Sequence, residues 1–162
     1  VAGGEDPLFI ARRLIILASE DVGNADPQAL PLATAAFQAV HAIGMPEGAI
    51  VLGQTTTYLA STVKSNASYL GLRAAQASVR ENGALGVPLH LRNAPTQLMK
   101  DQDYGKDYRY PHDHPGHFAS QDYFPPDLET RSFYLPSHQG MEKRIYDRLK
   151  QLWPERYPPE TG

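Results

Sequence analysis

The sequence has no cysteine among its 162 residues, and this absence removes several functions at once. Disulfides, thiolate zinc sites, iron–sulfur ligation and cysteine nucleophiles all depend on that side chain. Long apolar runs are also missing, because the longest, from about Leu14 to Ala18, falls far below the roughly 20 residues of a membrane helix. No charged and then apolar leader precedes it. We therefore expect a soluble cytoplasmic protein with no redox chemistry and no membrane segment.

An excess of positive charge is absent as well. Lys and Arg number 15 and Asp and Glu number 18, which gives a net charge of −3. A chain with this balance has no field that draws it onto a phosphate backbone, so nucleic-acid binding by these residues alone is disfavoured. The length suits one domain, 1–162, with a single core. A start at Val1 without methionine indicates a piece of a longer polypeptide.

Residues 1–87 are rich in alanine and leucine and contain residues that typically start and end helices. This pattern predicts an all-α fold that begins with a compact helical bundle. Asp6 and Asp26 each precede a proline, the pattern of an N-cap residue with proline at the first helical position. Gly44 suits the left-handed position after a helix, and Pro31 is expected to disturb the helix that contains it. The predicted helices are 7–20, 27–44, 46–61 and a fourth, capped by Ser65, that ends at Asn82.

The second half of the chain reads differently, because it holds most of the prolines, tyrosines and histidines. Residues 88–136 are predicted to be irregular, with a helical turn at 96–100 and an aromatic excursion from Tyr104 to Pro136 that lies across the bundle. Residues 137–153 are predicted to form a C-terminal amphipathic helix after Ser137, and the tail 154–162 to fray. This helix has an apolar side of Met141, Ile145, Leu149 and Leu152 and a charged side of Glu142, Lys143, Arg144, Asp147, Arg148 and Lys150.

The most informative absence is that of charge between Pro27 and Val63, where Glu47 is the single formally charged side chain. In a monomeric bundle, most helices expose one side to water, and that side usually carries Lys, Glu and Arg. Helices without them are expected where both faces are covered, by other helices of the chain or by another subunit. We favour self-association. The alternative is that these helices form the centre of a monomer, and that Thr and Gln are the polar residues on the part of their surface that faces solvent.

The residues that we expect to form this contact are apolar or aromatic and come from the first three predicted helices. They divide between core and intersubunit interface in a proportion that the sequence leaves open. They are Leu14, Ile15, Phe37, Val40, Ile50, Leu52, Tyr58 and Leu59.

No catalytic, cofactor-binding or metal-ligating residue is assigned. The stretch 48–55 has the glycine spacing of a phosphate-binding loop, but Gln54 stands where the lysine is needed and no strand precedes it. His112, His114 and His117, with Asp107 and Asp113, lack a visible set of converging zinc ligands and are interpreted as loop residues. No serine lies in a Gly-x-Ser-x-Gly elbow. The carboxylates are attributed to helix starts and solvent-exposed faces.

Several stretches, taken in order, nevertheless resemble one family. They include GEDPLFIARRL at 4–14, ASEDVGNADP at 18–27, KSNA at 64–67, VPLHLRNA at 87–94, YGK at 104–106 and GMEKRI at 140–145. Together they resemble the C-terminal region of the RarA/MgsA family of AAA+ ATPases, which is related to the eukaryotic Werner helicase-interacting protein. The resemblance covers nearly the whole chain.

This resemblance implies a helical domain akin to the collar of clamp-loader subunits, which holds family members together as homotetramers at stalled replication forks. It also implies that ATP and Mg²⁺ bind only in an N-terminal module that is absent here, so these residues are not an enzyme. Single-stranded DNA-binding protein is an expected partner, and DNA is expected to be contacted by the parent protein. The competing hypotheses are a module that docks such a partner through 104–136 and, third, a small metal-dependent hydrolase using the histidines.

Overall fold

The computed structural model describes residues 1–157, which form six α-helices and, within that range, no strand. The predicted all-α class is confirmed for these residues. The chain divides into two compact units, one made of Val1–Arg73 with Phe133–Arg148 and the other of Ala74–Ser132 with the residues from Leu149 onward. The organisation as one domain and the likeness to a clamp-loader collar stay predictions.

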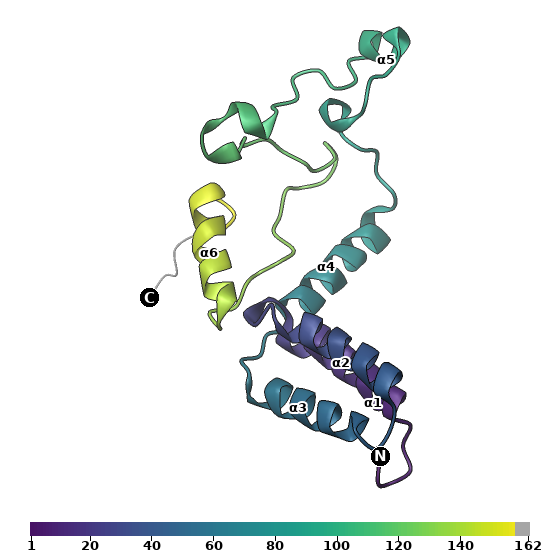
Figure 1. The fold of residues 1–162 in the computed structure, drawn as a ribbon. Coiled ribbons are helices and arrows are strands. Elements are labelled where there is room, and N and C mark those ends of the chain that lie inside the picture. The colour runs from purple at the N-terminus through teal and green to yellow at the C-terminus, as the bar shows by residue number, and fades with distance from the viewer. Residues whose placement is uncertain (158–162) are drawn as a thin grey trace. The chain divides into compact units, whose positions relative to one another are not determined.

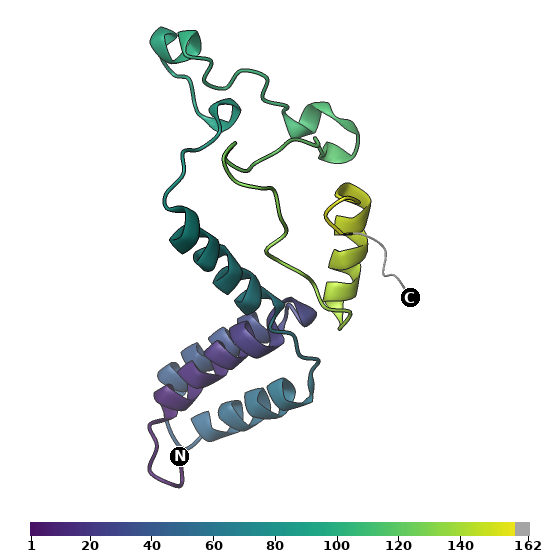
Figure 2. The same cartoon turned by 180° about the vertical axis from the view of Figure 1, so that it is seen from behind.

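Three helices of the first unit pack side by side: α1 (Pro7–Leu17), α2 (Ala29–Ile43) and α3 (Gly48–Ser61), as Figures 1 and 2 show. The predicted cap of α1 is confirmed, because the Asp6 carboxylate accepts a hydrogen bond from the Phe9 backbone N–H at 2.6 Å. Beyond Leu17 the chain continues as a π-helical turn, Ala18–Val22, and a 3₁₀ turn, Gly23–Ala25. The helical region therefore extends past the predicted end, with a changed hydrogen-bond pattern.

The start of α2 corrects one expectation. Pro31 was expected to disturb this helix, but it is the third residue of α2 and lies in the first turn. Backbone N–H groups in the first turn have no acceptor inside the helix, so the N–H that proline lacks removes no helical hydrogen bond. The other end is as predicted, since Gly44 has a φ of 68° and follows the last helical residue.

The remaining helices are α4 (Ala67–Asn82), α5 (Gln97–Asp101) and α6 (Met141–Leu152). The Ser65 hydroxyl accepts from the Ala67 N–H at 3.2 Å, and the Thr96 side chain caps α5, so helices are confirmed at both places. Helix α6 begins at Met141, four residues after the start of the predicted segment 137–153. Three short 3₁₀ turns, Leu89–Leu91, Pro111–Asp113 and Pro115–His117, lie between α4 and α6.

The core of the first unit comes entirely from α1, the turn after it, α2 and α3. Its small side chains let the helix backbones approach closely, while a few larger ones fill the space between them. Truncating Leu52 or Leu59 to alanine in such a core costs about 2–5 kcal/mol. The buried cluster is Ala11, Leu14, Ala18, Val22, Ala29, Ala33, Val40, Leu52 and Leu59.

The end of the second unit is held by aromatic contacts. The rings of Phe118 and Trp153 meet edge to face with centroids 5.1 Å apart, and the Arg156 guanidinium lies 4.1 Å from the Trp153 ring centroid. Tyr157 is buried and its N–H donates to the Trp153 carbonyl. The fraying expected of the tail is therefore wrong for 154–157, and 158–162 lie outside the described residues. Within the described part of the chain, every helix is too short or too polar to cross a membrane.

Candidate assembly surface

The structure separates the eight predicted contact residues into three groups. Leu14, Val40, Leu52 and Leu59 belong to the buried core. Ile15, Phe37 and Tyr58 are partly buried and pack against that core. Ile50 alone among the eight is open, with 75% of its surface exposed. Within one chain, seven of the eight residues therefore support the bundle, and Ile50 is the one available to a partner.

The exposed residues of α2 and α3 include no Lys, Arg, Asp or Glu, and we call them the neutral surface. Other exposed helix faces of this chain do carry charge, such as Arg12 and Arg13 on α1 and Lys143, Arg144 and Arg148 on α6. The lack of charge is therefore local to α2 and α3. The neutral surface consists of Leu30, Pro31, Thr34, Ala35, Gln38, His41, Ala42, Ile43, Ala49, Ile50, Gly53, Gln54, Thr56, Thr57, Ala60 and Ser61.

Large apolar side chains stand out from this surface. Leu30 is 43% exposed and Ile43 is 53% exposed, in addition to Ile50. Burying a whole side chain of this size is worth about 1.5–3 kcal/mol relative to leaving it in water, and covering the exposed half of Leu30 or Ile43 recovers part of that. A lone chain leaves these side chains in water, whereas a partner that covers them gains this free energy.

The threonines of the neutral surface are less polar than their composition suggests. The Thr34 hydroxyl donates to the Leu30 carbonyl at 2.9 Å, and the Thr57 hydroxyl donates to the Gln54 carbonyl at 2.8 Å. Each hydroxyl proton is hydrogen-bonded to a carbonyl of its own helix, so it does not require a water molecule as acceptor. Thr55, between them in the sequence, is buried and donates to Val51 at 2.9 Å. The Thr34 and Thr57 hydroxyls are thus compatible with a covered surface.

A second feature of the first unit is a buried carboxylate. The side chain of Glu142 is fully buried, and it accepts from the Ser65 hydroxyl at 2.6 Å, the Ser137 N–H at 2.7 Å and the Tyr134 hydroxyl at 2.8 Å. The spacing of α6 predicts that Glu142 lies on the charged, solvent-exposed side of the helix, and this prediction is wrong. Ser137 and Tyr134 lie just before α6, but Ser65 is 77 residues away, and the spacing within α6 gives no signal for it. We call these four residues the polar junction.

The predicted cap of the second helix at Asp26 is wrong, because α2 begins at Ala29 with Gln28 at the N-cap position, and the Asp26 carboxylate has other partners. One carboxylate oxygen accepts from the Tyr58 hydroxyl and from the Thr62 hydroxyl, each at 2.6 Å, while the other accepts from the Gln28 N–H at 3.1 Å. Tyr58 and Thr62 lie in and just after α3, so Asp26 ties the start of α2 to the end of α3. Burial raises the pKa of Asp26, but the bonds from Thr62 and Tyr58 outweigh it and hold it below its ordinary range.

Acid is expected to destabilise the first unit through Glu142. Burial raises the pKa of Glu142, but the hydrogen bonds from Ser137, Ser65 and Tyr134 outweigh it, so the folded pKa lies below the ordinary value of 4.5. The unfolded chain then binds the proton first as the pH falls. The stabilisation is present above 4.5 and is lost as the pH falls through the folded pKa.

Urea midpoints measured between pH 6 and pH 3 check this expectation. The midpoint should fall toward acid, and the fall should be shallower in a Glu142→Gln variant, which has no proton to bind there. An equal pH slope in both proteins would show that Glu142 contributes nothing to the acid sensitivity.

The candidate phosphate-binding and metal-binding residues of the sequence do not form ligand sites in the described structure. The stretch 48–55 is helical, and Gly48 packs on Val40, so its N–H groups cannot surround a phosphate. The rings of His112 and His117 lie 4.9 Å apart, but no three His, Asp or Glu residues among 1–157 are arranged to hold a metal ion.

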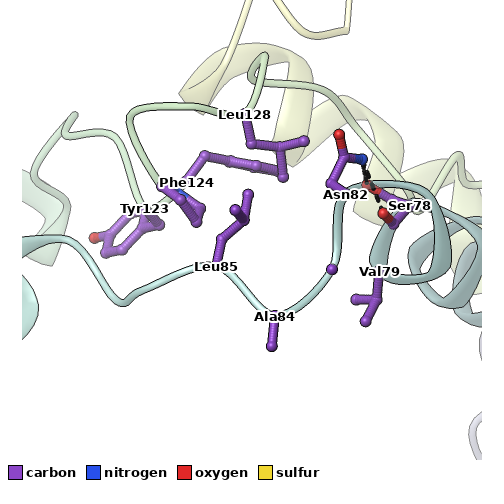
Figure 3. Close-up of a pocket in the computed structure, with 10 residues that line it drawn as sticks. Ser78, Val79, Asn82, Ala84, Leu85, Tyr123, Phe124 and Leu128 are labelled. Atoms are coloured by element: carbon purple, nitrogen blue, oxygen red, sulfur yellow. Dashed lines mark hydrogen bonds between the residues drawn. The ribbon is translucent and has the colours of Figure 1, made fainter.

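One apolar hollow lies within the second unit, with a volume of about 470 Å³. Figure 3 shows the side chains of Leu85, Phe124 and Leu128 directed toward one another around it. Of its polar lining residues, Asn82 donates to the Ser78 carbonyl at 2.8 Å, a bond within α4. The hollow therefore offers apolar contact and no converging set of catalytic groups.

Comparisons with known proteins agree with the resemblance. The family model described as MgsA AAA+ ATPase C terminal matches residues 1–153. Replication-associated recombination protein A of Coxiella burnetii is 49% identical over 149 residues, and the protein of the same name from Escherichia coli K12 is 45% identical over 153. These matches cover 91% and 94% of this chain. The ATPase WRNIP1 of Dictyostelium discoideum is 43% identical over 81% of this chain and 15% of its own length.

The chain spans 34% of the length of the two bacterial relatives, so most of each relative lies outside the matched region. The match nonetheless covers nearly all of this chain, at an identity far above the level at which a fold alone is shared. By this measure, the chain belongs to the family of MgsA AAA+ ATPase C-terminal regions, whose bacterial members include replication-associated recombination protein A.

Proposed function

We propose that this chain is a non-catalytic homo-oligomerization domain that holds AAA+ ATPase modules together, as a tetramer, in DNA replication, recombination and repair. The observation that carries the proposal is the neutral surface of α2 and α3. Its exposed isoleucines and leucine would be covered by a second copy, and no charge would have to be buried with them. The Asp26 bonds to Tyr58 and Thr62 fix α2 against α3, so the surface is presented as a rigid unit.

In this proposal the nucleotide chemistry lies elsewhere in the longer protein. ATP and Mg²⁺ act in an N-terminal module, and the DNA contact is made by the parent protein rather than by this domain alone. The net charge of −3 fits that division, because it provides no general attraction to phosphates. Assembly would bring several ATPase modules and their DNA contacts to one place, which raises the effective concentration of each.

The absolute mass of the chain in solution tests the proposal. Light scattering or sedimentation at micromolar concentration should give four times the 17.9 kDa of one chain. Dilution should dissociate the complex, because self-association follows mass action. A mass of one chain across the accessible concentration range would contradict it.

A second candidate function is docking of a replication partner such as single-stranded DNA-binding protein on the second unit. The apolar hollow around Leu85 and Leu128 favours it, as do the exposed rings of Tyr110 and Tyr123. Purified single-stranded DNA-binding protein titrated into the chain should then bind with a measurable heat that a Leu128→Asp variant loses. Unchanged binding by that variant would count against docking at this hollow.

A further inference from the structure

The polar junction joins segments that are far apart in the sequence. Ser65 precedes α4, Tyr134 and Ser137 lie in the segment before α6, and Glu142 is the second residue of α6. Asn24, in the turn before α2, extends the network, because its side-chain amide donates to the Tyr134 hydroxyl oxygen at 3.1 Å. The buried side-chain oxygen and nitrogen atoms of the described residues all have partners. The network is therefore complete around the carboxylate.

The network also has a fixed direction. An ionised carboxylate only accepts hydrogen bonds, so Ser65 and Tyr134 must each point their one hydroxyl proton at Glu142. The oxygen of Ser65 is then free to accept from the Ala67 N–H, which caps α4. In the same way, the oxygen of Tyr134 accepts from Asn24. Each of these further bonds depends on Glu142 as the acceptor at the centre.

The core of α1 to α3 does not depend on this network. All nine buried residues of that core lie between Ala11 and Leu59, and none comes from α4, α6 or the segment between Phe133 and Gly140. The junction therefore attaches the last part of the first unit to a bundle that has its own apolar core.

The Ser65 backbone N–H donates to the Asp21 carbonyl at 2.8 Å, which fixes Ser65 to the turn after α1. We propose that Glu142 is a latch that holds the start of α6 and the segment 133–140 to the α1–α3 bundle through Ser65, and whose loss releases them while the bundle stays folded. The latch is a conformational device: the hydrogen bonds to one carboxylate hold the C-terminal helix to the bundle. It operates whether or not copies of the chain assemble through the neutral surface.

A Glu142→Gln variant tests the latch with little change of volume. The amide replaces one acceptor oxygen with an NH₂ group, which can only donate. The hydroxyl of Tyr134 or Ser65 that donated to that oxygen then faces another donor. That hydroxyl must then turn away and give up its bond to Asn24 or to the Ala67 N–H. Removing a buried charged acceptor is expected to speed local opening by roughly tenfold to a hundredfold.

Amide hydrogen exchange of the full chain measures that opening segment by segment. Faster exchange in 65–70 and 133–148, with unchanged protection in α1 to α3, supports the latch. Tyr134→Phe removes one donor without touching the carboxylate and should show the same pattern more weakly, so the test survives if Glu142→Gln fails to fold. Arg144→Gln, an exposed change on the same helix outside the Lys143–Asp147 ion pair, is the control and should leave exchange unaltered.

Two results would overturn the proposal. If α1 to α3 lose protection together with α6 in the Tyr134→Phe variant, the junction is part of one cooperative core and not a latch. If neither Glu142→Gln nor Tyr134→Phe speeds exchange more than Arg144→Gln does, the carboxylate does not hold α6.

Discussion

Replacing Gly140 with alanine is expected to remove most of the stability with which the segment 133–140 and the start of α6 are attached to the α1–α3 bundle. Gly140 has a φ of 51°, and a Cβ built there would lie 2.1 Å from the Ala25 carbonyl oxygen and 2.8 Å from a Val63 methyl carbon. The backbone of 140 must therefore move away from the turn before α2, which separates Glu142 from Ser65. The expected cost is about 4 kcal/mol or more, because strain, a backbone clash and a broken buried network combine.

Urea denaturation followed by circular dichroism measures this loss. Gly53→Ala is the matched control, since Gly53 is a helical glycine of α3 with open space around the position of a Cβ. Alanine there should stabilise the chain by about 0.5–1 kcal/mol, the usual gain when a helix interior loses a glycine. If Gly140→Ala costs less than about 1 kcal/mol, the close approach of 140 to Ala25 does not constrain the fold.

Replacing Ile50 with glutamate is expected to dissociate the assembly into folded single chains. Ile50 is 75% exposed on α3, so the change has little effect on the bundle itself. Across a covered interface, however, it would bury an unpaired carboxylate where an apolar side chain had been. The dissociation constant should rise about a hundredfold or more, as it does at interface hot spots.

Leu98→Glu provides the comparison, because Leu98 is 68% exposed on α5 and lies outside the neutral surface. It introduces the same charge and should leave the solution mass unchanged. Phe37 and Tyr58 are poorer choices, since both pack on the core and a charge there would unfold the bundle. An Ile50→Glu protein that keeps the mass of the unmodified chain would show that α3 does not form the contact.

The sequence was sufficient where local rules decide the structure. The caps at Asp6 and Ser65 and the left-handed Gly44 depend on residues within a few positions, and each is confirmed. The apolar face of the first helix was also predictable, because Ala11, Leu14 and Ala18 recur at helical spacing and are buried together.

The polar junction could not be predicted in the same way. Glu142 stands beside lysine and arginine in a helix of strong amphipathic character, so its spacing assigns it to the charged side. What buries it is the approach of Ser65, which is 77 residues away in the sequence. Sequence periodicity reports the faces of one helix and carries no information about polar partners from other segments.

The division between core and assembly surface was open for a related reason. Leu52 and Ile50 are both apolar residues of α3, two positions apart, and only the packing of α1 and α2 shows that the first is buried and the second is not. Lack of charge correctly marked α2 and α3 as unusual. It could not indicate which residues of α2 and α3 stay exposed to solvent after the bundle has formed.

Reaction of a single introduced thiol tests most directly whether another copy covers the neutral surface. The chain has no cysteine, so Ile50→Cys and Leu98→Cys each create one unique labelling site. Our account predicts that a maleimide labels the Ile50→Cys protein at least about tenfold more slowly than the Leu98→Cys protein at high concentration, with the difference vanishing on dilution. Equal labelling rates at every concentration would show an open surface on α3 and would contradict the account.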